Sequence, residues 1–506
     1  MNKISTLLLF AIVVVDCAGA QPVTPLPDYS DRILTPPPAV APRLTGPRVF
    51  GLRPGHPLGH RLTATGERPL RFEAAGLPAG LTLDPATGQL TGSLAAVGEY
   101  ELQVSATNAR GTATRSFKLV VGEALALSPP LGWSSWYAMG DRVDQAGTLV
   151  AAQAMVATGL ADHGWSYINI DDGWQGQRHP VTHALQPSQR FPDMKQLSAQ
   201  VHALGLRLGI YSGPWVTTYA GYAGGSADTP EGTWQFPAKG QRSDRRFGAY
   251  TFEKIDAAQW VAWNIDFMKY DWHPMEPREA IRMAEALRGS GRDIVYSISN
   301  GANIYRREKY PKIANLWRTS NDIEDEWPTL ERIWSIHAPW APWSGPGRWA
   351  DPDMLLVGHM GLKGALRPTH LTPDEQYTHV SLWALWSAPL FVSCPLDRLD
   401  AFTLSLLSND DVLDVDQDSL GRMAVLVAKD GPGEVWAKPL AGGGWAVGLF
   451  NRGAASRPVR VTWAQLGASG ARPVRDLWRQ QDLGPATDHF EATVAPHGVV
   501  LVRIAP

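Results

Sequence analysis

The chain has 506 residues, of which 44% are hydrophobic and 19% are charged, and its formal net charge is −3. This length predicts several folded domains, and the hydrophobic content excludes a disordered chain. The nearly balanced charge gives no basic face for nucleic acid and no polybasic patch for a membrane surface. Two cysteines exclude a disulfide scaffold and a cysteine-rich metal site.

The first segment, residues 1–20, has the pattern of a secretory signal peptide. Lys3 supplies the positive charge, a short apolar run follows, and the small residues 18–20 form a cleavage site. The apolar run is too short to span a bilayer. A lipoprotein signal that uses Cys17 is the alternative. We therefore expect an exported protein, periplasmic or extracellular, without a membrane span.

The next two segments differ in composition. Residues 21–44 are rich in proline and predict a linker, partly in polyproline conformation. Residues 45–122 alternate apolar and polar side chains with a period of two, and turn sequences separate the runs. This pattern predicts a small β-sandwich that resembles the Ig-like modules of bacterial secreted enzymes.

Residues 128–410 alternate short apolar runs with stretches of helical periodicity, which predicts an α/β fold, a (β/α)8 TIM barrel. A strand pattern returns over residues 415–506 and predicts a C-terminal antiparallel β-sandwich domain. The eight predicted barrel strands are residues 131–136, 167–171, 206–211, 267–271, 294–297, 316–319, 349–354 and 390–393.

Acidic side chains stand at or just beyond the ends of four predicted strands. They are Asp171 with Asp172, then Asp271, Asp322 and Asp353. One such aspartate is ordinarily a helix cap or turn residue. Four strands of one barrel would bring their C-terminal ends to the same face, where barrel enzymes carry their active sites. Glycoside hydrolysis needs two carboxyl groups in this arrangement, so the pattern favours a glycosidase.

Two of these acids suit the two roles in glycoside hydrolysis. Asp271 fits the nucleophile, because Lys269 lies two residues earlier on the same strand and its charge would keep Asp271 ionised. Asp322 fits the acid/base, because desolvation and the charge of Asp271 would raise its pKa. Arg318 would clamp a sugar hydroxyl or steady a carboxylate. Tryptophan faces for a sugar ring are expected from Trp133, Trp136 and Trp174.

Several blocks of this region occur in the order and spacing of glycoside hydrolase family 27, the melibiase or α-galactosidase family of clan D. The resemblance covers residues 128 to about 422 and does not include the Ig-like module. The blocks are residues 131–136, 171–174, 209–212, 269–271, 317–322 and 349–354.

The resemblance implies a retaining mechanism in which Asp271 is the nucleophile and Asp322 the acid/base. Asp171 and Asp172 match the pair that holds the axial 4-hydroxyl and the 6-hydroxyl of galactose. Further substrate-binding positions that this resemblance and the loop after the fifth strand suggest are Trp136, Tyr211, Lys269, Ser299, Asn303, Arg318 and Asp353. No cofactor and no metal are expected, since carboxylates carry the chemistry.

The chain departs from the family pattern at a cystine that lines the pocket in many members. Gly173 and His273 stand where those members have cysteine, and Tyr219 stands at the position of the cystine partner. The pocket wall is therefore expected to be rebuilt. The basic run at residues 242–246 is expected to be a solvated loop.

The loop after the fifth strand leaves the substrate open. Members selective for N-acetylgalactosamine resemble Ser299 and Ala302 there, but the intervening Asn300-Gly301 departs from both known types. We therefore expect an exo-glycosidase acting on oligosaccharides or polysaccharides with terminal α-galactose. Its alternatives are an α-N-acetylgalactosaminidase, a β-L-arabinopyranosidase, an isomaltose-releasing dextranase and, in another class, a non-catalytic carbohydrate-binding barrel. No nucleic-acid partner is expected, and the sequence does not predict an oligomeric state.

Overall fold

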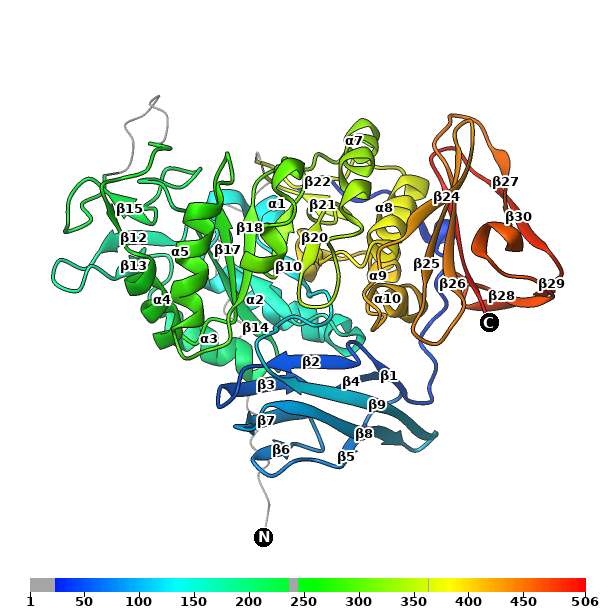
Figure 1. The fold of residues 1–506 in the computed structure, drawn as a ribbon, viewed down its shortest axis with the longest axis horizontal. Helices are drawn as coiled ribbons and strands as arrows, with labels where there is room; N and C mark the ends of the chain where they lie inside the picture. Colours follow the sequence, from blue (N-terminus) through cyan, green and yellow to red (C-terminus); the bar gives the residue numbers. More distant parts are fainter. Residues whose placement is uncertain (1–22, 236–243, 363) are drawn as a thin grey trace, which may run out of the picture.

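The computed structural model describes residues 23–235, 244–362 and 364–506, so the predicted signal peptide lies outside the described residues. These residues form a central barrel, a small β-sandwich beneath it and a C-terminal β-domain at its side (Figure 1). None of the helices in these ranges is both long and apolar enough to cross a membrane.

Eight parallel strands form the barrel, as predicted. They pair in the order β20-β19-β18-β17-β14-β11-β10-β23, and a parallel bridge from Leu355 to Val392 brings the two ends of the sheet together. Helices cover the outside, so the strands are buried on both faces and read as apolar runs. The strands are β10 (Leu131–Ser134), β11 (Tyr167–Asn169), β14 (Arg207–Ser212), β17 (Phe267–Asp271), β18 (Val295–Ser299), β19 (Leu316–Arg318), β20 (Trp349–Asp351) and β23 (Leu390–Val392).

The helices around the barrel begin at ordinary N-terminal signals. Helix α8 is an example: Thr372 and Glu375 form a capping box around Pro373, which stands in the first helical turn. This helix is buried along almost its whole length because it lies between the barrel and the C-terminal domain (Figure 1). The helices are α1 (Trp136–Met139), α2 (Gln145–Ala157), α3 (Met194–Ala203), α4 (Glu253–Ala262), α5 (Pro277–Arg288), α6 (Tyr310–Ile313), α7 (Trp327–His337), α8 (Pro373–Leu385), α9 (Ala401–Leu407) and α10 (Asp410–Asp416).

The C-terminal domain has two antiparallel sheets with a separate apolar core, as expected of a sandwich. The larger sheet has the order β24-β25-β26-β31-β28-β29, and the smaller one pairs β27 with β30. The strands are β24 (Val425–Asp430), β25 (Gly433–Pro439), β26 (Trp445–Asn451), β27 (Arg457–Thr462), β28 (Arg472–Asp476), β29 (Gln481–Ala486), β30 (His489–Val494) and β31 (Val499–Ile504).

The N-terminal module is also a β-sandwich with its own core. Its sheets have the orders β2-β9-β8-β5, β3-β7-β6 and β1-β4. The strands are β1 (Arg43–Thr45), β2 (Val49–Leu52), β3 (Pro57–Arg61), β4 (Thr63–Thr65), β5 (Arg71–Ala75), β6 (Leu81–Leu83), β7 (Gln89–Ser93), β8 (Gly98–Asn108) and β9 (Gly111–Val121).

The proline-rich segment before the module is packed against the barrel. Arg32 makes an ion pair of 2.8 Å with Asp374 at the start of α8, and the amide of Leu34 donates to the hydroxyl of Tyr377 over 3.0 Å. The hydroxyl of Thr35 donates to the carbonyl of residue 405 over 2.9 Å. These contacts fix the described part of the predicted linker along α8 and α9.

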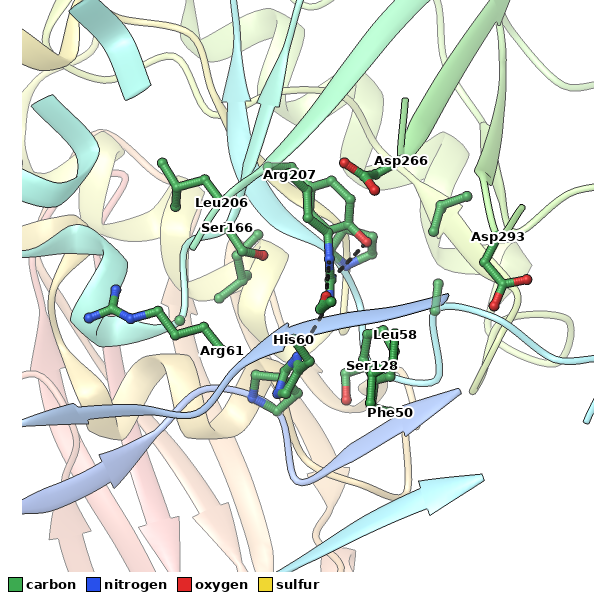
Figure 2. A pocket seen from close by; sticks show the side chains of 18 of the residues that line it. Phe50, Leu58, His60, Arg61, Ser128, Ser166, Leu206, Arg207, Asp266 and Asp293 are labelled. Carbon is green, nitrogen blue, oxygen red and sulfur yellow. Dashed lines mark hydrogen bonds between the residues drawn. The ribbon is translucent and has the colours of Figure 1, made fainter. Parts of the chain in front are cut away.

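The module docks on the N-terminal ends of the barrel strands. Arg207 at the start of β14 donates from Nη2 to the carbonyl of Gly59 over 2.7 Å, and its guanidinium lies 4.7 Å from the ring centre of Phe50 (Figure 2). Asp293, before β18, accepts from the amide of Arg53 over 2.9 Å and lies 2.8 Å from Nδ1 of His56. The boundary therefore combines charged pairs with aromatic packing.

This boundary encloses a cavity of about 420 Å³ (Figure 2). Its charged groups already engage one another, since Asp266 contacts His202 over 2.7 Å and Arg292 over 2.5 Å. At a second point the two backbones approach so closely that a Cβ built on Gly164 would lie 2.8 Å from the Cα of Gly46. The module therefore packs closely against the barrel.

We predict that Gly164→Ala lowers the free energy of unfolding by about 1–3 kcal/mol more than Gly159→Ala does. Both glycines have positive φ, +102° and +83°, so both substitutions strain the backbone, but a Cβ at Gly159 meets nothing within 4 Å. Thermal and denaturant unfolding of the two variants measures the difference. Equal losses in the two variants would show that the close approach at Gly164 is not rigid.

Candidate active site

A cavity of about 250 Å³ opens at the C-terminal ends of the barrel strands. It lies at the end of the barrel opposite the N-terminal module, where strand ends and the loops after them converge. It is lined by Trp136, Tyr137, Asp171, Asp172, Tyr211, Tyr219, Ala220, Arg245, Lys269, Asp271, Arg318, Asp322, Asp353 and Met354. The predicted catalytic and substrate-binding residues other than Ser299 and Asn303 are in this set, whereas the expected tryptophans Trp133 and Trp174 are not.

The ammonium of Lys269 forms its ion pair with Asp171 and acts on Asp271 only through space. Lys269 Nζ lies 2.8 Å from Asp171 Oδ2. Burial alone would lower the pKa of Lys269, but the attraction of Asp171 and Asp271 outweighs it and raises the pKa. Lys269 is therefore a charged group that anchors Asp171 and acts on Asp271 through space.

Asp271 ends β17 and is 8% exposed. Its Oδ2 accepts a hydrogen bond of 3.2 Å from the hydroxyl of Tyr211, and its Oδ1 has no hydrogen-bond partner among the described residues. Burial raises the pKa of Asp271 to about 6, although the charge of Lys269 opposes this shift. The charge of Lys269 lowers the pKa of Asp271 as expected, but desolvation raises this pKa by more.

Asp322 lies on the loop after β19 and its side chain is 62% exposed. Arg318 pairs with its Oδ1, and Nδ2 of Asn300 donates to the same oxygen over 3.1 Å. Desolvation raises the pKa of Asp322, but the charge and hydrogen bond of Arg318 outweigh it, so the pKa lies below its ordinary value. The raised pKa expected from the sequence is therefore wrong for the free site, because the arginine is bound directly to the carboxylate.

Arg318 is a buried hub of the site. Its Nη1 lies 3.0 Å from Asp353 Oδ1, and its Nε donates to the carbonyl of Ser320 over 3.0 Å. Asp353 has the unusual φ of +95°, and its amide donates to Asp351 Oδ1 over 2.8 Å. A positive φ is costly for a residue with a side chain and is typical of functional sites. In this conformation the Asp353 carboxylate meets Arg318.

Asp171 and Asp172 follow β11 and are both buried. Asp171 Oδ2 accepts from Lys269 and from the hydroxyl of Ser134 over 3.3 Å. Asp172 Oδ2 accepts from the amide of Ala220 over 2.8 Å. Burial raises the pKa of Asp172 to about 7 against this hydrogen bond. Asp172 is therefore partly protonated near neutral pH.

Two predicted substrate-binding residues do not line this cavity. Ser299 lines a smaller cavity of about 40 Å³ inside the barrel, and its hydroxyl has no hydrogen-bond partner among the described residues. Asn303 is exposed, and its Oδ1 accepts from the amide of Tyr305 over 3.0 Å at the start of a short helical turn. Asn303 therefore acts as a cap in this structure.

Of the three tryptophans expected at the site, only Trp136 lines the cavity. Trp133 and Trp174 are fully buried. Their indole nitrogens donate to backbone carbonyls, at 2.8 Å in each case, of residues 394 and 211. These two tryptophans belong to the apolar core of the barrel and do not form a sugar platform.

The cavity wall that the sequence analysis expected to be rebuilt contains Tyr219, and beside it lies Arg245, which was not predicted at the site. Tyr219 packs edge-on against Trp215 with ring centres 5.1 Å apart, and the guanidinium of Arg245 lies 4.6 Å from the centre of the Tyr219 ring. This aromatic and cationic stack stands where the family pattern has a cystine. Arg245 belongs to the basic run expected to be solvated, of which residues 242–243 lie outside the described residues. Nothing in the sequence around Arg245 distinguishes it from a residue of an ordinary solvated loop.

Comparisons with known proteins match all three parts of the chain. A family model described as alpha galactosidase A matches residues 129–237 and 238–418. A model described as alpha galactosidase C-terminal beta sandwich domain matches residues 430–504, and an Ig domain model matches residues 53–122.

Individual proteins agree with these matches. The chain is 36% identical over 388 residues to Alpha-galactosidase 2 of Arabidopsis thaliana, covering 75% of this chain and 90% of that protein. A solved structure of a candidate α-galactosidase from Bacteroides fragilis has a TM-score of 0.82 at 29% identity, covering 92% of this chain and 98% of that one. A wild-type β-L-arabinopyranosidase structure from Geobacillus stearothermophilus has a TM-score of 0.66 at 29% identity, covering 75% of this chain and 97% of that one.

We predict that Asp271→Asn stabilises the protein above pH 6 and has no such effect at pH 4. Burial raises the pKa of Asp271 from 3.8 to about 6, so ionisation of this group costs folding free energy as the pH rises through that range. Asparagine stays neutral, and the gain at pH 7 should reach about 3 kcal/mol. Denaturant unfolding of both proteins at several pH values measures it.

The control is Asp228→Asn. The hydrogen bond from Arg246 lowers the pKa of Asp228, so stability from this group is lost as the pH falls and the substitution should be unfavourable at neutral pH. A stability difference for Asp271→Asn that does not change with pH would contradict the assigned shift.

Proposed function

Because this chain belongs to the α-galactosidase family of glycoside hydrolases, we propose that it is an exported, retaining exo-glycosidase that releases terminal α-linked D-galactose. Its substrates are oligosaccharides or polysaccharides that end in this sugar. The observation that carries the proposal is that Asp271 and Asp322 line the same cavity together with Lys269 and Arg318. The secretory pattern of residues 1–20 supports export.

The chemistry is a double displacement. A carboxylate oxygen of Asp271 attacks the anomeric carbon while Asp322 gives its proton to the glycosidic oxygen, so the bond to the leaving group breaks as the glycosyl-enzyme bond forms. In the second step Asp322 takes a proton from water. The water oxygen then attacks the same carbon and frees Asp271, which retains the anomeric configuration.

The reacting form needs Asp271 ionised and Asp322 protonated. The free site favours the reverse, since the pKa of Asp271 is raised to about 6 and that of Asp322 is lowered. A bound sugar supports the reacting form by displacing water from the exposed side chain of Asp322 and raising its pKa. The negative charge of Asp322 raises the pKa of Asp271, and the reaction needs one group ionised and the other protonated, so a bell-shaped dependence of kcat/KM on pH follows.

Galactose recognition falls to the remaining lining groups. Asp171 and Asp172 offer acceptor oxygens to the 4-hydroxyl and 6-hydroxyl, as the family pattern implies, and Trp136 offers an apolar face to the sugar ring. Asp172 accepts a backbone hydrogen bond on Oδ2, while its Oδ1 has no partner among the described residues. A buried acceptor without a partner costs free energy, and a sugar hydroxyl that donates to Asp172 Oδ1 would remove this cost.

A second candidate function is α-N-acetylgalactosaminidase. Ser299 and Ala302 are both small and buried; β18 pairs Ser299 with Asp271 in register, and the amide of Ala302 donates to the carbonyl of Arg318. Small side chains at these positions leave room for an acetamide group. The intact Asp171 and Asp172 argue against the β-L-arabinopyranosidase reading, which the Geobacillus relative represents, because arabinopyranose has no 6-hydroxyl to hold.

We predict that Asp271→Asn and Asp322→Asn retain the wild-type circular dichroism spectrum and each lose catalytic activity. Loss of the nucleophile should lower kcat by about four orders of magnitude, and loss of the acid by about two to four. Hydrolysis of an aryl α-galactoside measures the rates, and NMR of the first-formed product measures retention. Near wild-type turnover in either variant, or an inverted product, would refute the mechanism.

We predict that replacing Ser299 by Glu and Ala302 by Leu together shifts the substrate preference toward plain galactose. The ratio of kcat/KM for aryl α-galactoside to that for aryl α-N-acetylgalactosaminide should rise by about tenfold or more, since the larger side chains fill the acetamide space. Arabinopyranoside and α-glucoside serve as further substrates in the same assay. An unchanged ratio would assign the selection to another wall of the cavity.

A further inference from the structure

We propose that Asn300 is a positioning residue that holds the Asp322 carboxyl with one oxygen anchored and the other turned to the leaving group. The inference rests on the proposed function, in which Asp322 is the proton donor. Asn300 follows β18 directly and stands at the rim of the barrel. It was singled out in the sequence only because it departs from the family pattern.

The backbone of Asn300 is fixed from neighbouring segments. Its amide donates to the carbonyl of Trp272 over 3.0 Å, and Nδ1 of His273 lies 3.2 Å from its carbonyl oxygen. Gly301 then turns with φ +65°, and a Cβ there would lie 2.8 Å from Oδ1 of Asn321. The turn that presents Asn300 therefore needs glycine at the next position.

The side-chain amide of Asn300 bridges a cation and an anion. Its Oδ1 accepts from Arg318 Nη2 over 2.5 Å, and its Nδ2 donates to Asp322 Oδ1 over 3.1 Å. The reverse orientation of the amide would place its nitrogen against the guanidinium and its oxygen against the carboxylate. The charges on the two sides therefore fix which way the amide points.

The consequence for Asp322 is an unequal treatment of its two oxygens. Asn300 and Arg318 both donate to Oδ1, and among the described residues no hydrogen bond reaches Oδ2. The side chain is 62% exposed, so packing alone would leave it free to rotate. Anchoring Oδ1 leaves Oδ2 to carry the proton to the glycosidic oxygen.

Arg318 cannot do this alone, because its guanidinium also serves Asp353 and the carbonyl of Ser320. The position of the guanidinium is set by its contacts with Asp353 and Ser320 and not by Asp322. Asn300 supplies a second point of attachment from a different loop, and two points fix an orientation that one does not. This division gives Asn300 its positioning role.

The test compares two substrates with different leaving groups. In Asn300→Ala the kcat/KM for an α-galactosyl disaccharide should fall by about tenfold or more, because a sugar leaving group needs the proton. The value for a dinitrophenyl α-galactoside should change little, because that leaving group departs as an anion. If Asn300 only formed part of the pocket wall, its loss would lower kcat/KM for both substrates to the same extent.

The pH profile is a second readout. Asn300→Ala removes a donor to the ionised form of Asp322, so the basic limb of kcat, which reports the substrate-bound site, should move to higher pH. Asn300→Asp has nearly the same shape and places a carboxylate beside Asp322, so it should move that limb further in the same direction. The matched control is Asn321→Ala. Asn321 is the exposed residue directly before Asp322, and its loss should show no leaving-group dependence.

Equal losses on both substrates, together with an unmoved basic limb, would overturn the role of Asn300. Asp322→Ala is assayed on the same pair of substrates. If its loss depends on the leaving group and that of Asn300→Ala does not, only the inference about Asn300 fails. If the loss in Asp322→Ala does not depend on the leaving group, the acid assignment itself fails.

Discussion

Two buried cations, Lys269 and Arg318, allow a group of carboxylates to share one small cavity. Lys269 anchors Asp171, and Arg318 holds both Asp322 and Asp353. A buried charge without a partner is expensive, so these pairs offset part of the cost of burying the carboxylates. The two other carboxyls of the cavity lack a direct cationic partner in the described chain, and their pKa values are raised by burial. Arg318 lowers the pKa of the exposed Asp322, whereas burial outweighs the same guanidinium at Asp353 and raises its pKa.

Much of this arrangement could be predicted because it follows from local pattern and from barrel geometry. The eight strands were found as short apolar runs, since parallel strands covered on both faces carry apolar side chains throughout. Their polar ends were recognised as a site because parallel strands of one barrel end on one face. That argument alone brought Asp271 and Asp322 to a common cavity, and the resemblance then suggested their roles.

The rest could not be predicted because it depends on contacts between distant segments. Lys269 lies on the same strand as Asp271, yet its direct partner is Asp171, which is 98 positions away. The lowered pKa of Asp322 results from the side chains around it, which the position of the residue on a loop does not reveal. Arg245 reaches the cavity from a loop whose composition resembles an ordinary solvated segment, and the role of Asn300 emerges only once the amide is seen between two charges.

The docking of the N-terminal module has a consequence for how such enzymes recombine. Its basic residues form ion pairs with acids outside the module: Arg61 pairs with Asp162, and Arg43 pairs with Asp411 on α10. A glycine pair adds a backbone approach that side chains on either surface would block. The module therefore should not dock in the same way on a barrel that lacks these contacts. A barrel that accepts it would need acids at the positions of Asp162 and Asp411 and a glycine at the position of Gly164, so we expect module and barrel to be inherited together.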